Sequence, residues 1–179
     1  DKLGYYCTES SEHNAEYNCF YIKSRYPELI EKSKRIVELA LDLDTTIITT
    51  HIGVVPGDKN HDRYKIMQEA CGELARFADS MGAHFAVETG PETSDTLGDF
   101  LDSLNSTGVA VNLDPANLRM VTGDDPVKAV HRLKKYIVHT HAKDGNRLAV
   151  GDPEIIYGVV HPVPTEFQGV RFYEEVPLG

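Results

Sequence analysis

Apolar residues along positions 27–142 recur with two different spacings. In some segments they fall three or four positions apart, which places them on one face of an amphipathic helix. In shorter segments β-branched and apolar residues run together, which is typical of buried strands. The predicted helices cover Pro27–Leu43, a segment through Met67 and Met81 that ends at Gly82, a segment from Leu97 to Leu104 capped by Thr93 or Ser94, and a segment that begins at Asp125-Pro126. The predicted strands are Thr45–Val54, His84–Gly90, Gly108–Asp114 and Ile137–Ala142.

This alternation of strands and helices predicts an α/β fold with a parallel sheet, because helical crossovers join parallel strands. The pattern breaks after the fourth strand. Pro and Gly residues then punctuate two strand-like runs, Glu154–Val160 and Val170–Val176, so residues 145–179 are expected to form a loop excursion or lid. Residues 1–26 show no clear period and are expected to be irregular. No linker divides the chain, which predicts a single domain.

Composition narrows the class of protein. The chain has 28 Asp and Glu against 18 Lys and Arg, a net charge of −10 at pH 7. Such a surface repels phosphate backbones, so no nucleic acid partner is expected. No apolar run approaches the roughly 20 residues of a membrane span. The three cysteines lack metal-type spacing, and so sparse a set fits a reducing cytoplasm.

Ionisable residues stand at or near the ends of the predicted strands, namely His51, Glu88, Asp114 and His141. In a parallel sheet the carboxyl ends of all strands lie on one edge, where α/β proteins place their functional sites. Successive side chains of a strand point to opposite faces of the sheet. The residues on the face opposite these polar side chains are mostly apolar, as packing against helices requires. We therefore expect these polar side chains to meet on an inner face.

Glu88, Asp114 and His141 together suit a divalent metal ion. Two carboxylates and one imidazole form a mixed oxygen and nitrogen site for Mn²⁺, Mg²⁺, Co²⁺ or Zn²⁺. Each residue also has a simpler explanation, since a strand-end histidine is more often structural and Asp114-Pro115 is a common turn. Their equivalent positions in consecutive strands favour the metal site, because unrelated turn residues would rarely align in this way.

Three motifs, V-E-T-G, N-L-D-P-A-N-L and H-T-H-A-K-D, together resemble the xylose isomerase-like TIM barrels of the sugar phosphate isomerase/epimerase superfamily. The resemblance covers about Pro27 to Arg147 and continues into E-V-P-L-G. It implies a (β/α)8 barrel in which Glu88, Asp114 and His141 are metal ligands on strands five, six and seven. Mn²⁺ is the ion expected first. The resemblance also implies that Arg147 matches a substrate-contacting arginine of ketose 3-epimerases.

The sequence departs from this family pattern in two ways. Ketose 3-epimerases carry a histidine three residues after the ligand aspartate, and here Asn117 occupies that place. A second glutamate is expected on the eighth strand, beyond the V-P-L-G motif. A TIM barrel typically needs about 250 residues. The chain is therefore expected to be an incomplete barrel, about strands four to seven plus the loop excursion, that binds metal weakly by itself.

The resemblance implies a divalent-metal-dependent isomerase or epimerase of a sugar, sugar phosphate or inositol-type ketone, acting through an enediolate. Glu88 would be the catalytic base. The residues expected to contact this small-molecule substrate are His51, Asn117, Lys143 and Arg147, whereas His139 is expected to be structural. Two alternatives are a phosphodiesterase resembling endonuclease IV, which the charge of −10 disfavours, and a non-catalytic sugar-binding barrel. A homo-oligomer is left open.

Overall fold

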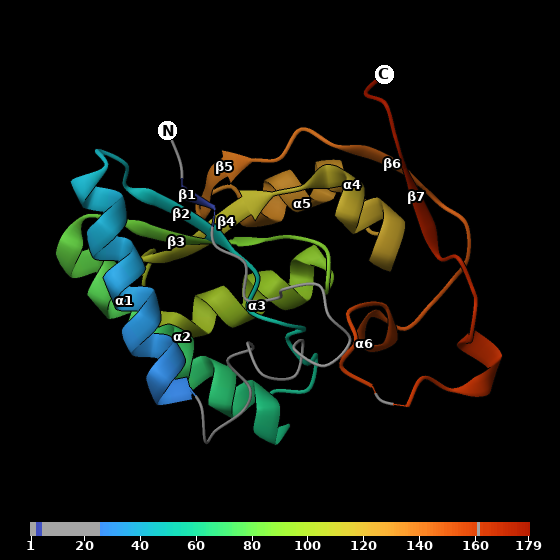
Figure 1. Cartoon of the computed structure of the whole chain (residues 1–179), viewed down its shortest axis with the longest axis horizontal. Coiled ribbons are helices and arrows are strands. Elements are labelled where there is room, and N and C mark those ends of the chain that lie inside the picture. The colour runs from blue at the N-terminus through green and yellow to red at the C-terminus, as the bar shows by residue number, and fades with distance from the viewer. Residues whose placement is uncertain (1–2, 5–25, 161) are drawn as a thin grey trace.

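The computed structural model describes residues 3–4, 26–160 and 162–179. A five-stranded sheet has the order β1-β2-β3-β4-β5, and every neighbouring pair is parallel. Its strands are β1 (Leu3–Gly4), β2 (Ile47–Thr50), β3 (His84–Glu88), β4 (Val109–Leu113) and β5 (Ile137–Thr140). Consecutive parallel strands joined by helices are the wall of a β/α barrel (Figure 1). The predicted fold class is confirmed.

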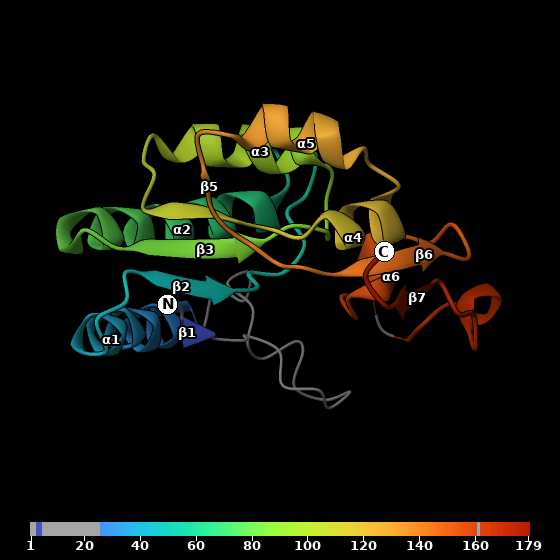
Figure 2. The ribbon, with the colours of Figure 1, turned by 90° about the horizontal axis from the view of Figure 1, so that it is seen from above.

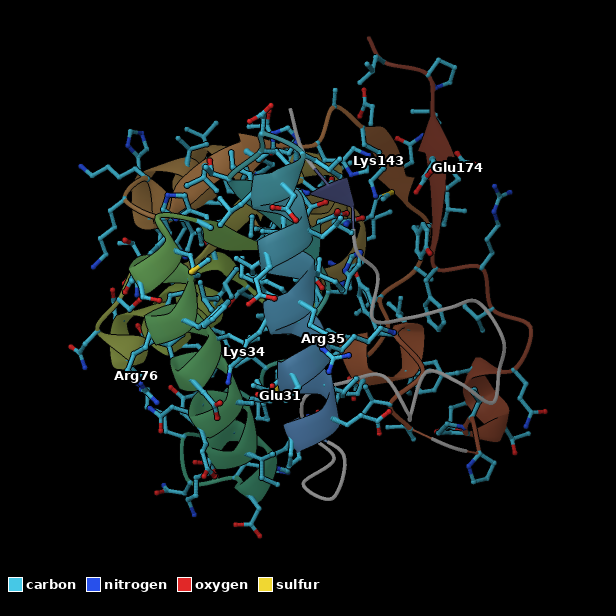
Figure 3. All side chains as sticks on the ribbon, turned by 60° about the vertical axis from the view of Figure 1, so that its left-hand side comes forward. Glu31, Lys34, Arg35, Arg76, Lys143 and Glu174 are labelled. Atoms are coloured by element: carbon cyan, nitrogen blue, oxygen red, sulfur yellow. The ribbon has the colours of Figure 1, made fainter. Side chains whose placement is uncertain are left out.

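The four long helices follow the predicted pattern, and their ends are set by local signals. They are α1 (Tyr26–Asp42), α2 (Asp62–Met81), α3 (Ser94–Leu104) and α5 (Pro126–Leu133). Gly82 ends α2 in the left-handed conformation at φ 64°, where glycine costs least. Thr93, not Ser94, caps α3, and Asp125 caps α5 with Pro126 at the first helical position. Lys34 of α1 bonds Glu73 of α2 at 2.8 Å, between the neighbouring helices of Figure 3.

The main hydrophobic core lies between the sheet and the helices. Phe85 and Val87 of β3 and Val109 and Val111 of β4 belong to it. The residues that alternate with them point to the opposite face, where Glu88 accepts a hydrogen bond from Asn112. This is the predicted alternation. Figure 2 shows the arrows of β2 and β3 pointing toward the side where α4, α6 and the β6–β7 hairpin lie, so that side is the carboxyl edge of the sheet.

Several elements differ from the predictions. The strand expected over Thr45–Val54 is confined to β2. Two short helical elements, α4 (Pro115–Asn117) and the π-helix η2 (Leu118–Thr122), were not predicted, because segments this short show no helical period. The prediction of a strand over Glu154–Val160 is wrong. Its first part is the helix α6 (Pro153–Ile156), because Asp152 caps that segment and Pro153 favours the first turn.

The C-terminal segment is more ordered than a loop excursion. In it β6 (Asp144–Arg147) pairs antiparallel with β7 (Tyr173–Val176), and η3 (Thr165–Phe167) is a short 3-10 helix. The run expected over Val170–Val176 is thus a shorter strand. Of the segment expected to be irregular at the N-terminus, residues 1–2 and 5–25 lie outside the described residues. Within the described ranges, no helix combines the length and the apolar character that a membrane crossing requires.

Candidate metal centre

Glu88, Asp114 and His141 meet at the carboxyl edge of the sheet. Glu88 is the last residue of β3, Asp114 follows β4, and His141 follows β5. One ligand atom from each lies within 4.8 Å of the other two. His141 Nδ1 is 3.3 Å from Glu88 Oε1 and 3.4 Å from Asp114 Oδ2. Both carboxylates are buried and the imidazole is partly exposed, so the cluster opens to one side only.

The backbone around Asp114 is fixed by its neighbours on both sides. The hydroxyl of Thr89, just after β3, accepts the N–H of Asp114 at 2.8 Å and donates to its carbonyl at 2.9 Å. Asp114 Oδ1 then accepts the N–H of Asn117 at 2.9 Å as the N-cap of α4. These bonds use one carboxylate oxygen for folding and leave the other for the cluster.

Asp114 Oδ2 is a buried oxygen that needs a positively charged partner. This atom is buried, and it has no correctly aligned hydrogen-bond donor among the described residues. Lys143 Nζ lies 2.8 Å away as an ion-pair partner. A buried carboxylate oxygen is costly unless it is paired or bound to a metal. Together with Glu88 and His141, it forms an oxygen and nitrogen donor set that fits a divalent ion.

Glu88 is oriented by two amide side chains. Asn112 Nδ2 donates to its Oε2 at 3.2 Å, and Asn117 Nδ2 donates to its Oε1 at 3.1 Å. Asn117 can approach because Gly90 lies beside it at φ 138°, and a Cβ on Gly90 would lie 2.4 Å from the Asn117 Cβ. The carboxylate is therefore held in one orientation at the end of its strand.

A cavity of about 300 Å³ lies over these groups. It is lined by His51, Glu88, Asn117, Val121, His141, Lys143, Ile156, Tyr157, Tyr173 and Glu175. Five residues expected from the sequence to bind metal or substrate thus share one pocket, and Asp114 lies buried beneath them. We call this cavity the metal pocket. His139 does not line it.

Two basic side chains of the metal pocket differ in charge. Burial lowers the pKa of the His51 imidazole, whose Nε2 lies 3.9 Å from Glu88 Oε2, so the ring is neutral at pH 7. Burial opposes the charge of Lys143 as well, but its bond to the Asp114 carboxylate outweighs this and raises the Lys143 pKa. Lys143 is therefore an ammonium ion at the start of the hairpin, where Figure 3 labels it.

Arg147 is not brought to the metal pocket. It lines a separate cavity of about 330 Å³ with Arg119, Gly123 and Asn146. The physical reason is the pairing of β6 with β7, which holds the chain extended away from the sheet. Four residues of extended chain from Lys143 span about 13 Å. Lys143 and Arg147 thus line different cavities, and the expectation that both contact one small substrate stays a prediction.

Sequence reasoning missed the wall of the metal pocket that comes from the C-terminal segment. Tyr157 follows α6, and Tyr173 and Glu175 belong to β7. No spacing signal marks them, because their positions depend on the pairing of β6 with a strand more than 25 residues away. Ile156 and Tyr157 pack against a small cluster formed by Ala116, Met120 and Val121, and this contact holds the wall in place.

One similarity to a characterised protein is confined to a short stretch. The chain is 59% identical over 44 residues to the alpha-galactosidase of Bacillus subtilis (strain 168), which covers 25% of this chain and 9% of that protein. A match to so small a share of an enzyme carries no assignment of its activity.

Several solved structures resemble the fold over most of the chain, among them the following three. A xylose isomerase domain protein from Planctomyces limnophilus has a TM-score of 0.73 at 22% identity, covering 99% of this chain and 60% of that one. A D-tagatose 3-epimerase-like protein has a TM-score of 0.64 at 18% identity, and the match covers 85% of this chain and 70% of that one. A xylose isomerase-like TIM barrel protein from Mycobacterium smegmatis, solved in complex with magnesium, has a TM-score of 0.60 at 19% identity. That match covers 98% of this chain and 56% of the other.

The chain thus spans about 60% of the Planctomyces limnophilus protein, the first of these structures. The sequence profile of one family, the xylose isomerase-like TIM barrel, matches residues 17–164, which is most of the chain. The three motifs, the parallel sheet and the profile agree, and the chain belongs to the xylose isomerase-like TIM barrel family.

Proposed function

We propose that this chain is part of a divalent-metal-dependent enzyme that isomerises or epimerises a sugar, a sugar phosphate or an inositol-type ketone. The observation that carries the proposal is the convergence of Glu88, Asp114 and His141 within 4.8 Å at the floor of an open pocket. Neighbours in the sugar isomerase and epimerase superfamily, including a D-tagatose 3-epimerase-like protein, support the substrate class.

Glu88, Asp114 and His141 are the residues that would hold the ion, Mn²⁺ being the first candidate and Mg²⁺, Co²⁺ and Zn²⁺ the others. When bound, a divalent ion supplies Lewis acidity that polarises a substrate carbonyl and favours the negative charge of an enediolate. The buried Asp114 Oδ2 lies 3.4 Å from His141 Nδ1, and this arrangement of donors supports the assignment. The magnesium complex of the Mycobacterium smegmatis neighbour is consistent with a hard divalent cation.

Glu88 is the proposed base, and its two oxygens have different surroundings. Oε1 faces His141 at 3.3 Å, on the side of the ligand cluster. Oε2 faces Asn112 and the neutral His51 on the other side. We assign Oε2 to accept the proton from the carbon next to the substrate carbonyl, because Oε1 lies on the side of the ligand cluster and would contact the ion.

The remaining polar residues of the metal pocket would orient the substrate. Lys143 offers an ammonium group to a substrate oxygen that gains negative charge, and Asn117 and His51 offer hydrogen bonds to hydroxyls. The pocket of about 300 Å³ suits a small sugar. Arg147 receives no role in this pocket, because it lines a different cavity.

The test is proton exchange at substrate carbon. The full protein containing this chain, with added Mn²⁺, is incubated in D₂O with a panel of ketoses, ketose phosphates and inositol ketones. We expect deuterium at the carbon next to the carbonyl of one class. Glu88→Gln should abolish the exchange with an unchanged circular dichroism spectrum, whereas Glu38→Gln on the exposed face of α1 should not. Metal and sugar binding without any exchange would instead indicate a non-catalytic sugar-binding barrel.

A further inference from the structure

A second cavity, of about 430 Å³, lies at the same edge of the sheet. Residues after β2, around the start of α3 and at the start of α6 line it, together with Thr122. The helix α6 and its caps separate it from the metal pocket. Asp152, Pro153 and Glu154 face the second cavity, whereas Ile156 and Tyr157 face the metal pocket. We call this cavity the Glu92 cavity, after its one buried carboxyl group.

Glu92 has hydrogen-bonding capacity that the described residues do not use. Its side chain is buried, with 8% of the residue exposed, and it lines the cavity. Its Oε2 accepts the N–H of Val55 at 3.1 Å, and this is the one hydrogen bond to Glu92 found among the described residues. The other carboxyl oxygen, Oε1, is not one of the fully buried unpartnered atoms among the described residues, so it is open to a hydrogen bond from a ligand in the cavity.

The protonation of Glu92 limits which ligands suit it. Burial raises the pKa of this carboxyl to about 8, so at neutral pH it is mostly the neutral acid. A neutral carboxyl group both donates and accepts hydrogen bonds, as a hydroxyl group does. Such a pair of donor and acceptor matches a ligand hydroxyl better than it matches an anion.

The rest of the lining agrees with a neutral, hydroxyl-bearing ligand. No Lys or Arg is among the described residues that line the cavity, whereas Asp152 and Glu154 add carboxylates at its edge. Glu154 is already paired with Arg63 of α2. The other lining side chains are threonine hydroxyls and the apolar surfaces of valine and proline. Phosphates and carboxylates are therefore disfavoured, and the polar and apolar mixture suits the faces of a sugar.

We propose that the Glu92 cavity is a binding site for a neutral sugar or polyol, with the Glu92 carboxyl group as its central hydrogen-bonding partner. The site is separate from the metal pocket and uses none of the metal ligands. It does not rest on the proposed isomerase chemistry, because binding there needs neither an ion nor a proton transfer.

The test measures binding by the metal-free full protein, with a chelator present. Xylitol and D-glucitol are the neutral probes, and D-glucitol 6-phosphate is the anionic comparison. Saturation-transfer difference NMR and chemical-shift titration report binding and its affinity. We expect both neutral polyols to bind, and the phosphate to bind more weakly because it meets Glu154 and Asp152 without a lining cation.

Variants locate the site. Glu92→Leu should weaken xylitol binding about tenfold, the loss expected for one or two hydrogen bonds, whereas Glu92→Gln keeps a donor and an acceptor and should retain most of it. Gly57→Phe provides a second route if Glu92→Leu does not fold. Gly57 lines the cavity, and a Cβ there meets nothing within 4 Å, so the ring should block the cavity without disturbing the core.

Glu88→Gln is the control, because it alters the metal pocket and should leave xylitol binding unchanged. The proposal is overturned if neither neutral polyol binds the native protein, or if the phosphate binds more tightly than D-glucitol. It is also overturned if Gly57→Phe retains full binding, or if Glu88→Gln loses it, since either result would place the polyol elsewhere. None of these outcomes depends on deuterium exchange, so they leave the test of the proposed function independent.

Discussion

Asp114 Oδ2 lies 2.8 Å from Lys143 Nζ, and the side chains of the two residues are 0% and 15% exposed. The ammonium group therefore faces the same oxygen that points to Glu88 and His141. In the absence of another cation, Lys143 offsets part of the negative charge that the two carboxylates concentrate at this edge. A bound divalent ion would share Asp114 with it.

Replacing Lys143 by Met should lower the stability of the metal-free protein. The buried Asp114 charge then lacks its ion-pair partner and repels Glu88, which we expect to cost about 2 kcal/mol or roughly 4–8 °C in melting temperature. Added Mn²⁺ supplies the missing positive charge, so it should raise the melting temperature of the variant more than that of the native protein. Calorimetry with and without Mn²⁺ measures both. Equal Mn²⁺ shifts in the two proteins would rule out a shared Asp114.

Asp114→Asn should reduce Mn²⁺ affinity by roughly 100-fold or more, because it removes a charged ligand. The amide retains an oxygen that can cap α4 at Asn117, so the fold should be preserved. Asp42→Asn, at the exposed end of α1, is the matched control. Isothermal titration calorimetry measures the Mn²⁺ affinity of both variants. Similar affinities for Asp114→Asn and Asp42→Asn would show that Asp114 is not a metal ligand.

Gly90→Ala should destabilise the protein by about 1–3 kcal/mol. The added Cβ would lie 2.4 Å from the Asn117 Cβ, and the backbone at φ 138° is one that side chains rarely adopt. The control is Gly57→Ala, where a Cβ meets nothing within 4 Å. Urea unfolding should separate the two substitutions clearly. If Gly90→Ala is as stable as its control, the close approach of Asn117 does not depend on glycine.

Glu92 should make the folded state less stable as pH rises. Its pKa is raised from 4.5 to about 8 by burial. Below pH 4.5 the group is protonated in both states, and its contribution is constant. Between these values the folded state keeps a proton that the unfolded state releases, so the free energy of unfolding falls with pH, and above pH 8 the loss is complete.

Glu92→Gln isolates this effect, since the amide does not titrate. Relative to the native protein, the variant should gain stability between pH 5 and pH 8.5 by a few kcal/mol. Urea unfolding at both pH values gives the difference. A constant difference between variant and native protein across this range would show that Glu92 has an ordinary pKa.

The sheet and the convergence of the three candidate metal ligands could be predicted because both depend on local pattern. Alternation along β3 and β4 marks which side chains face the helices, and the parallel order brings Glu88, Asp114 and His141 to one edge whatever the rest of the chain does. The helices α2, α3 and α5 carry capping residues directly at their ends.

The position of Arg147 and the walls of the two cavities could not be predicted, because they depend on contacts between residues far apart in the sequence. Arg147 lines a different cavity from the metal pocket, because β6 pairs with β7. The residue spacing around Arg147 does not indicate that β7 is the partner strand. The α6 helix is a different case. Asp152-Pro153 is the same signal that correctly predicted the start of α5 at Asp125-Pro126, but the apolar run after it suggested a strand. Glu92 has no sequence signature, since its pKa follows from burial.

The short helix α6 lies between the Glu92 cavity and the metal pocket, outside the sheet that carries Glu88, Asp114 and His141. The three proposed metal ligands lie at the ends of strands whose register is set by the whole sheet. Of the four residues of α6, Pro153 and Glu154 line the Glu92 cavity and Ile156 lines the metal pocket. None of the four belongs to the sheet or to the main core. If the proposed function holds, substitutions in α6 would alter the choice of ligand and leave the proposed metal ligands unchanged, so this short helix is where we expect substrate preference to vary.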